Sequence, residues 1–334
     1  MSLSSLATPA LAADTPAAWL AEQLAGRYDL DPDRGDEPAL VRPGWTGLLE
    51  LIDAGVIEEV HGRLVADGKP PKVASTCSAG RFGAAIAEAI GFGLAAGGAG
   101  FVTPEHVRVH VHEGGWVDAV ELEGARTLVV GDHPWAGQDG VEVASPEEVL
   151  AGSVHALVEA CAPIVDACRS LATVGRAGLW NEIGDSLGSS LAYQDRVTST
   201  PAMLAVLDAA VRVPGVPWSA TPTLRIVHSD VVGPVHVAQK GGCCLAYTVD
   251  QAGDDDVDTD ADLRAFRERF PVDDGPRYCG TCSFRTPEDC DARRLFWLER
   301  EVLLAPWDDS TDALLLVADE TGNWRHAVPT ETGR

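Results

Sequence analysis

Five of the eight cysteines lie in one stretch near the C-terminus, where their spacing could hold a metal centre. Cys243 and Cys244 are adjacent, Cys279 and Cys282 form a C-x-x-C, and Cys290 follows. A C-x-x-C turn lets two thiolates face the same metal centre, as in many structural metal sites. The two pairs together supply four thiolates, which is the number that a tetrahedral zinc ion or an iron–sulfur cluster needs.

Glycines accompany both cysteine pairs. Gly241 and Gly242 precede the first pair, and Gly280 lies inside the C-x-x-C. Glycine adopts backbone angles that other residues avoid. We therefore expect these glycines to give both turns conformational freedom.

Four kinds of site compete for these cysteines. Two adjacent cysteines do not easily occupy two corners of one zinc tetrahedron. A disulfide framework suits a secreted chain, and a thioredoxin-like C-x-x-C is expected to open a helix in a βαβ unit without a second pair. An iron–sulfur cluster has several iron atoms, so neighbouring cysteines can bind it without crowding one metal. The sequence therefore favours such a cluster and leaves the other sites open, with these ligands: Cys243, Cys244, Cys279 and Cys282.

The order of the cysteines resembles that of the ferric-siderophore reductases of the FhuF-like family, which bind a [2Fe-2S] cluster near the C-terminus. The family usually has a short spacer between the two pairs, whereas here 34 residues intervene, from Leu245 to Tyr278. Most of the excess is an Asp-rich segment, which a surface insertion could supply at little thermodynamic cost. The stretch 178–181, Gly-Leu-Trp-Asn, followed by Ser186-Leu187, is similar to a second element of the family.

This resemblance implies a reductase that passes one electron from a [2Fe-2S] cluster to siderophore-bound Fe(III) and releases Fe(II). It implies no catalytic residue beyond the four thiolates. The chain has no convincing nicotinamide or flavin motif, so the electron must come from a donor such as a ferredoxin or a flavin reductase. A non-enzymatic iron–sulfur carrier or sensor and a zinc-stapled binding protein remain alternatives.

Four arginines surround the C-x-x-C in an otherwise acidic chain: Arg277, Arg285, Arg293 and Arg294. Cations near a thiolate-bound cluster stabilise its more negative, reduced form. The same arginines could dock an acidic electron donor or an anionic ferric siderophore. They could instead pair with carboxylates of the following helix, which are Glu288, Asp289 and Asp291.

Composition limits the partners and the location. The net charge of −26 and the pI near 4.5 argue against nucleic acid and anionic membranes, because both would repel the chain. Residues 1–14 lack the basic and apolar regions of a signal peptide. The most apolar run, 82–102, contains Glu88 and many glycines, which favours a buried helix over a membrane span. We therefore expect a cytoplasmic protein without an integral membrane span.

Hydrophobic periodicity predicts a mainly helical α+β fold with a small antiparallel sheet and a C-terminal cysteine-rich iron–sulfur region. The predicted helices are 17–27, 45–56, 78–96, 146–172, 180–193, 201–211 and 287–304, and 60–72 is predicted as a strand or turn. The predicted strands are 106–112, 116–122, 125–130, 223–229 and 235–238, with a terminal hairpin of 314–317 and 324–328.

The sequence is divided into four parts: a helical appendage, 1–72, an α+β domain, 73–240, a C-terminal cysteine region, 241–300, and a tail or hairpin, 301–334. The resemblance implies that 73–240 is a siderophore-reductase-like domain and that 241–300 binds the [2Fe-2S] cluster.

Overall fold

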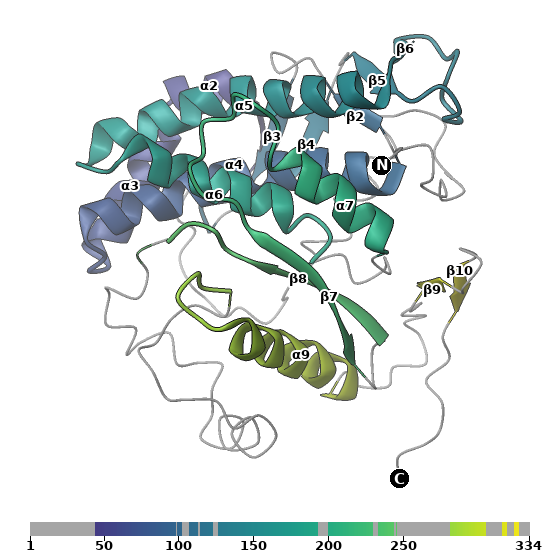
Figure 1. The fold of residues 1–334 in the computed structure, drawn as a ribbon. Coiled ribbons are helices and arrows are strands. Elements are labelled where there is room, and N and C mark those ends of the chain that lie inside the picture. Colours follow the sequence, from purple (N-terminus) through teal and green to yellow (C-terminus); the bar gives the residue numbers. More distant parts are fainter. Residues whose placement is uncertain are drawn as a thin grey trace.

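The computed structural model describes residues 44–97, 99–101, 107–112, 114–122, 126–192, 200–229, 233–243, 245, 281–304, 316–318 and 324–326. Most of the helices lie together in one body, with a β-hairpin and the last long helix beneath it (Figure 1). The predicted helix 17–27, half of the predicted metal ligands and Arg277 lie outside the described residues.

The helical body is built from helices of very different length. Their bounds are α2 Leu48–Asp53, α3 Val56–Ala66, α4 Pro71–Phe92, α5 Pro146–Leu171, α6 Arg176–Gly188 and α7 Pro201–Ala210. A capping box begins α5, since the Ser145 hydroxyl accepts from the backbone N–H of Glu148 while the Glu148 carboxylate accepts from the backbone N–H of Ser145. The predicted bounds of α5 and α7 agree with the structure to within one residue.

The segment 60–72, predicted as a strand or turn, is instead the end of α3, a short loop and the start of α4. Ile57, Val60 and Leu64 of α3 are buried and follow one another at helical spacing. They belong to the same hydrophobic core as α4, as do the buried leucines of α2. The described part of the predicted appendage thus shares the core of the residues that follow it.

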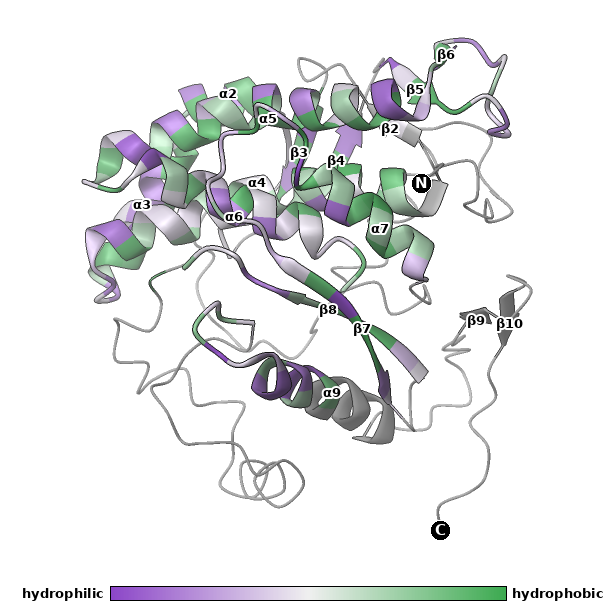
Figure 2. Ribbon diagram, viewed as in Figure 1, coloured by the Kyte–Doolittle hydropathy of each residue, from purple (hydrophilic) through white to green (hydrophobic). Residues whose placement is uncertain are grey.

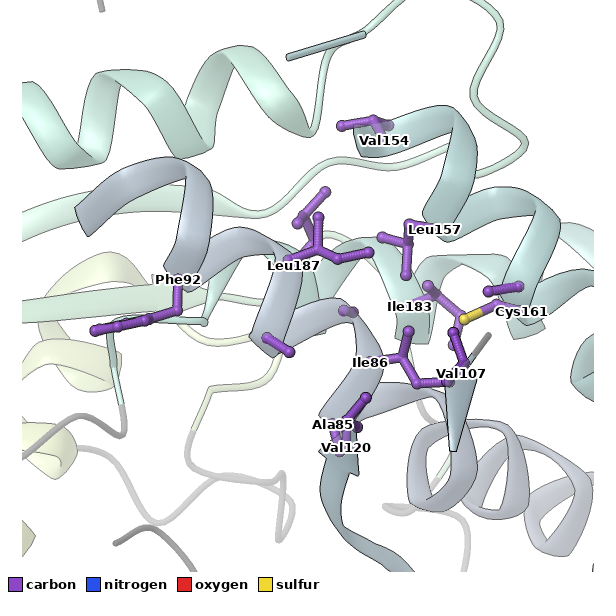
Figure 3. Close-up of a cluster of buried hydrophobic side chains, with 14 of the residues drawn as sticks. Ala85, Ile86, Phe92, Val107, Val120, Val154, Leu157, Cys161, Ile183 and Leu187 are labelled. Atoms are coloured by element: carbon purple, nitrogen blue, oxygen red, sulfur yellow. The ribbon is translucent and has the colours of Figure 1, made fainter. Parts of the chain in front are cut away.

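The hydrophobic core lies where α4, α5 and α6 meet the strands β3 and β4, and Figure 3 shows part of it. Ile86 of α4, Leu157 of α5 and Ile183 of α6 are almost completely buried there. Cys161 and Cys168 of α5 are also fully buried, as expected for cysteines that behave as small hydrophobic residues. Burial raises the pKa of both thiols to about 12, so they stay protonated.

Glycines let α4 and α6 approach each other closely. A Cβ atom at Gly83 would lie 2.1 Å from the Ile183 side chain, and one at Gly91 would lie 2.8 Å from the carbonyl oxygen of Leu187. A side chain at Gly91 would meet the backbone of α6, whereas one at Gly83 would force the Ile183 side chain to move. Helix α6 is therefore held at a fixed distance from the middle of the body.

The described strands form several small sheets rather than one. Their bounds are β1 Gly44–Gly47, β2 Ala99–Phe101, β3 Val107–Val111, β4 Val117–Leu122, β5 Thr127–Val129, β6 Val141–Val143, β7 Thr223–Ser229, β8 Gly233–Gln239, β9 Leu316–Ala318 and β10 Trp324–His326. The sheets are β1-β3-β4, β2-β5-β6, β7-β8 and β9-β10. A mainly helical α+β fold is thus confirmed, but β5 pairs with β2 and β6, not with β4, and the β5–β6 pair is parallel. The predicted terminal hairpin is confirmed as β9 and β10.

The lower layer consists of the β7-β8 hairpin and helix α9, Pro287–Leu304, which has the predicted bounds. Val235 and Val237 of β8 pack against Cys290 and Leu295 of α9. Figure 2 shows that α9 begins with hydrophilic residues, whereas α7 is mostly hydrophobic. Near its start, α9 therefore turns its apolar side toward the β7-β8 hairpin.

Helix α5 is the one described helix that is long and apolar enough to cross a membrane. Half of its most apolar window is buried inside the protein, where it packs against α4 and α6. A core helix of this kind passes the same test of length and composition. This finding agrees with the expectation of no integral membrane span.

The glycine contact between α4 and α6 is testable by replacing Gly91 with alanine. The new methyl group would meet the Leu187 carbonyl and the Ser190 side chain, so we expect Gly91→Ala to lower the free energy of unfolding by about 1–3 kcal/mol. Urea denaturation would measure the change. Gly62→Ala on α3 is the control, since nothing lies within 4 Å of its Cβ position and it should stabilise by about 0.5–1 kcal/mol. Equal stabilisation by both substitutions would contradict this packing.

Candidate metal centre

The segments that lead to Cys243 and to Cys282 meet at the end of β8. The backbone N–H of Lys240 donates to the carbonyl oxygen of Thr281 over 2.8 Å. Lys240 lies three residues before Cys243, and Thr281 directly precedes Cys282. The chain therefore leaves this point after the first cysteines and returns to it at the C-x-x-C, whatever the length of the segment between.

Both described cysteines of the predicted set are thiols and not halves of a disulfide. Cys243 is half-buried and Cys282 is buried. The Cys243 sulfur accepts a hydrogen bond of 3.3 Å from the backbone N–H of Leu245, a residue with a positive φ of 62°. Backbone N–H donors directed at sulfur are also a feature that tunes iron–sulfur clusters.

Cys244 and Cys279, the other predicted ligands, lie outside the described residues. Within the residues that are described, three or more metal-binding side chains do not gather in one place. Cys243 and Cys282 are thus the two predicted ligands that the structure describes, and the ligand set as a whole stays a prediction.

Helix α6 supports the turn that carries Cys243. The carboxylate of Asp185 accepts from the backbone N–H groups of Gly241 and Gly242, over 2.8 and 3.2 Å. One turn earlier, Asn181 accepts from the backbone N–H groups of the loop 219–220. The Gly-Leu-Trp-Asn element, 178–181, and the residues that follow it therefore form the helix surface against which the turn before Cys243 packs.

The two glycines before Cys243 provide space and not unusual backbone angles, which corrects the expectation from the sequence. Neither adopts a positive φ. A Cβ atom at Gly241 would lie 2.3 Å from the carbonyl oxygen of Thr221, and one at Gly242 would lie 2.5 Å from Cβ of Asn181. The turn is thus enclosed on both sides. Gly280 lies outside the described residues.

The charges behind the turn are buried. The Asp185 side chain is almost completely inaccessible, and burial raises its pKa to about 7. The N–H of Gly241 and the ammonium group of Lys240 oppose this shift, while the neighbouring Glu182 carboxylate adds to it. Glu182 itself accepts from Lys240 Nζ over 2.7 Å. Two carboxylates and one ammonium group therefore stand between α6 and the cysteine turn.

A second polar network fixes the turn that carries Cys282. The Gln239 amide nitrogen donates to the carbonyl oxygens of Cys282 and Arg285, over 3.1 and 2.8 Å. The Gln239 oxygen accepts from Arg225 of β7, and Arg225 also donates to Asp291 of α9 over 2.6 Å. The hairpin thereby binds both the C-x-x-C turn and the start of α9.

Sequence reasoning missed this network and the role of Asp185. Arg225 is an ordinary polar residue of the predicted strand 223–229, and Gln239 directly follows the predicted strand 235–238. Their partners on the other side of the site lie about 40 to 70 residues away in the chain. Asp185 carries a weak indication only, since it lies four residues after Asn181 of the Gly-Leu-Trp-Asn element and so shares its helix face.

The arginines near the C-x-x-C engage groups of the protein itself. Arg285 and Arg293 both form ion pairs with Asp289, and Arg294 donates to the carbonyl oxygen of Ala192. The side chain of Arg285 is only 7% exposed. The predicted pairing with α9 carboxylates is therefore present for two of the four arginines, and the docking role of the set stays a prediction.

Cys290 lies in the apolar contact between α9 and β8 and is fully buried. Burial raises the pKa of its thiol, although the nearby Arg225 opposes the shift. These surroundings suit a packed helix cysteine better than a thiolate ligand.

No protein-family model matches the chain, and no curated protein matches it at a significant level. The function of this site is therefore inferred from its own geometry and from the resemblance of its cysteines.

The buried Asp185 gives a pH-dependent prediction. Its pKa is about 7 in the folded protein and near 3.8 when exposed, so the folded state binds the proton more tightly. The stability that it contributes is fully present below about pH 4 and is lost as the pH rises to about 7, with a slope approaching 1.4 kcal/mol per pH unit.

Asp185→Asn should remove this slope. Urea denaturation of both proteins across this range would measure it, since the other titrating groups largely cancel in the difference. The variant should gain stability relative to the wild type as the pH rises. Parallel stability curves would show that Asp185 titrates in the ordinary acidic range.

The contact between Lys240 and Thr281 predicts that the Asp-rich segment can be shortened. Deleting residues 253–262 should leave bound metal per chain unchanged, because both ends of the segment are already held at one place. Metal analysis of the purified deletion variant would test this. A Gly-Ser replacement of the same length is the control that separates the effect of length from that of sequence. Loss of metal in both variants would mean that the segment itself positions the ligands.

Proposed function

We propose that the chain is a ferric-siderophore reductase that carries a [2Fe-2S] cluster on the two cysteine pairs predicted from the sequence. The observation that supports this most is the hydrogen bond from Lys240 to Thr281. It brings the Gly-Gly-Cys turn and the C-x-x-C turn to the same end of β8. The long spacer is the main departure from the family pattern, and this contact makes its length immaterial to the site.

The chemistry of the donor set fits a cluster. Cys243 and Cys282 are both thiols, and a backbone N–H is already directed at the Cys243 sulfur. When bound, the cluster would supply single electrons to siderophore-bound Fe(III), whose hard oxygen ligands hold Fe(II) less well. The chain itself would contribute Cys243, whose turn is held by α6, and Cys282, whose turn is held by the β7-β8 hairpin.

The remaining parts of the proposal follow from this chemistry. Reduction of bound iron needs no general acid and no nucleophile, so no catalytic residue is assigned beyond the thiolates. The electron donor is a separate protein such as a ferredoxin or a flavin reductase. Both steps belong in the reducing cytoplasm, where thiolate ligands persist.

The first experiment is metal analysis with a visible spectrum of the anaerobically purified protein. We expect about two iron atoms and two sulfide ions per chain, with a red-brown colour. A colourless protein with stoichiometric zinc would identify a zinc-stapled binding protein instead. Steady release of Fe(II) from a ferric siderophore by the reduced protein would distinguish a reductase from an electron carrier or sensor.

The ligand set is tested by serine substitution of each proposed cysteine, Cys243, Cys244, Cys279 and Cys282. Each variant should lose the cluster or bind it weakly, because the serine oxygen is a harder and more basic ligand than thiolate. Iron content per chain and the visible spectrum are the measurements. A full and unchanged spectrum in any one variant would remove that residue from the set.

The matched controls are alanine substitutions of cysteines placed in apolar surroundings. Cys161→Ala and Cys290→Ala should retain the cluster, although the lost sulfur atoms lower stability by roughly 1–2 kcal/mol. Loss of iron in Cys290→Ala with an intact fold would make Cys290 a ligand, contrary to its packing between α9 and β8.

A further inference from the structure

We propose that Asp185 is a positioning residue for Cys243, and that its carboxylate also lowers the reduction potential of the metal centre bound there. The first part concerns the protein alone. The second part rests on the proposed function, because it requires a redox-active cluster.

The positioning role of Asp185 rests on hydrogen bonds to both of its carboxylate oxygens. Both N–H groups immediately before Cys243, those of Gly241 and Gly242, donate to the two oxygens of the Asp185 carboxylate. Hydrogen bonds to a charged acceptor are stronger than those between neutral groups. The contact is also buried, so water cannot easily replace either donor.

Two neighbouring segments restrict movement of the turn. Gly241 lies against the backbone of Thr221, and Gly242 lies against Asn181. Asp185 shares a helix face with Asn181, and glycine contacts with α4 hold that helix in place. The position of Cys243 is thus linked to the middle of the core through one carboxylate.

The second part follows from the direction of the amides and from the local charge. The two N–H groups that point to Asp185 are not available to the Cys243 sulfur, where they would raise the potential. Lys240 interacts with both Glu182 and Asp185, so two carboxylates share one ammonium group and a net negative charge remains when Asp185 is ionised. A negative charge behind the turn that carries Cys243 makes the addition of an electron to a centre bound there less favourable.

Amide hydrogen exchange tests the positioning role. In the full-length protein, as purified and after removal of metal, Asp185→Asn should speed exchange at Gly241 and Gly242 by about ten-fold or more. The control is Asp208→Asn on α7, which makes the same chemical change at an exposed ion pair with Arg212 and should leave exchange at the turn unchanged. Equal exchange in wild type and Asp185→Asn would overturn the positioning role.

Potentiometric titration tests the electrostatic role, at about pH 8.5 so that Asp185 is ionised in the wild type. The Asp185→Asn variant should shift to higher potential, Asp185→Glu should stay closer to the wild type, and Asp208→Asn should not move. If Asp185 had a structural role only, its variants would bind less cluster, but the reduction potential of the cluster that remained would not follow this order. An unchanged potential in Asp185→Asn with a full cluster would overturn the electrostatic role.

A second variant covers the case in which Asp185→Asn does not fold. Gly242→Ala leaves Asp185 intact but pushes the turn away from α6, since the new Cβ would meet Asn181. It should release the same two amides, and unchanged exchange there would overturn the proposal. Absence of iron in the wild type would instead overturn the proposed function, and the exchange result would stand by itself.

Discussion

Helices α4 and α6 can approach each other closely only because glycines occupy their points of contact. A side chain at Gly91 would meet the α6 backbone and one at Gly83 would meet the Ile183 side chain, so α6 lies close against the middle of the core. This constraint decides where the opposite, polar face of α6 lies. That face carries Asn181, Glu182 and Asp185, and the cysteine turn rests on it. Helix α6 thus packs into the core through one face and supports the candidate site through the other.

The elements with strong local patterns were predictable from the sequence. Helix α9, the β7-β8 hairpin and the capped start of α5 have clear periodicity or cap residues, and the structure confirms them. The prediction of a strand or turn at 60–72 was wrong, since this segment contains the end of α3 and the start of α4, whose first turn tolerates proline. The grouping of strands into several sheets depends on contacts distant in sequence, which periodicity does not contain.

The candidate site was predictable only in part, for a physical reason. Residue types and order point to the cysteines, because thiolate chemistry is specific. The groups that hold them are common residues whose role exists only in three dimensions, as Gln239 and Asp185 illustrate. Local charge is another such case. The arginines around the C-x-x-C stand out in a chain of net charge −26, yet two of them are engaged by one aspartate of α9.

The dependence of Cys282 on α9 has a consequence for the order in which the protein is made. Cys282 is placed by Gln239, which is itself braced by Arg225 and its partner Asp291 on α9. That helix follows the last predicted ligand in the chain. A nascent chain in which all four cysteines have just been synthesised therefore still lacks Asp291, the α9 residue that holds Arg225 beside Gln239. Under the proposed function, metal delivered at that moment would meet thiols that the fold has not yet arranged, so loading would follow synthesis of α9.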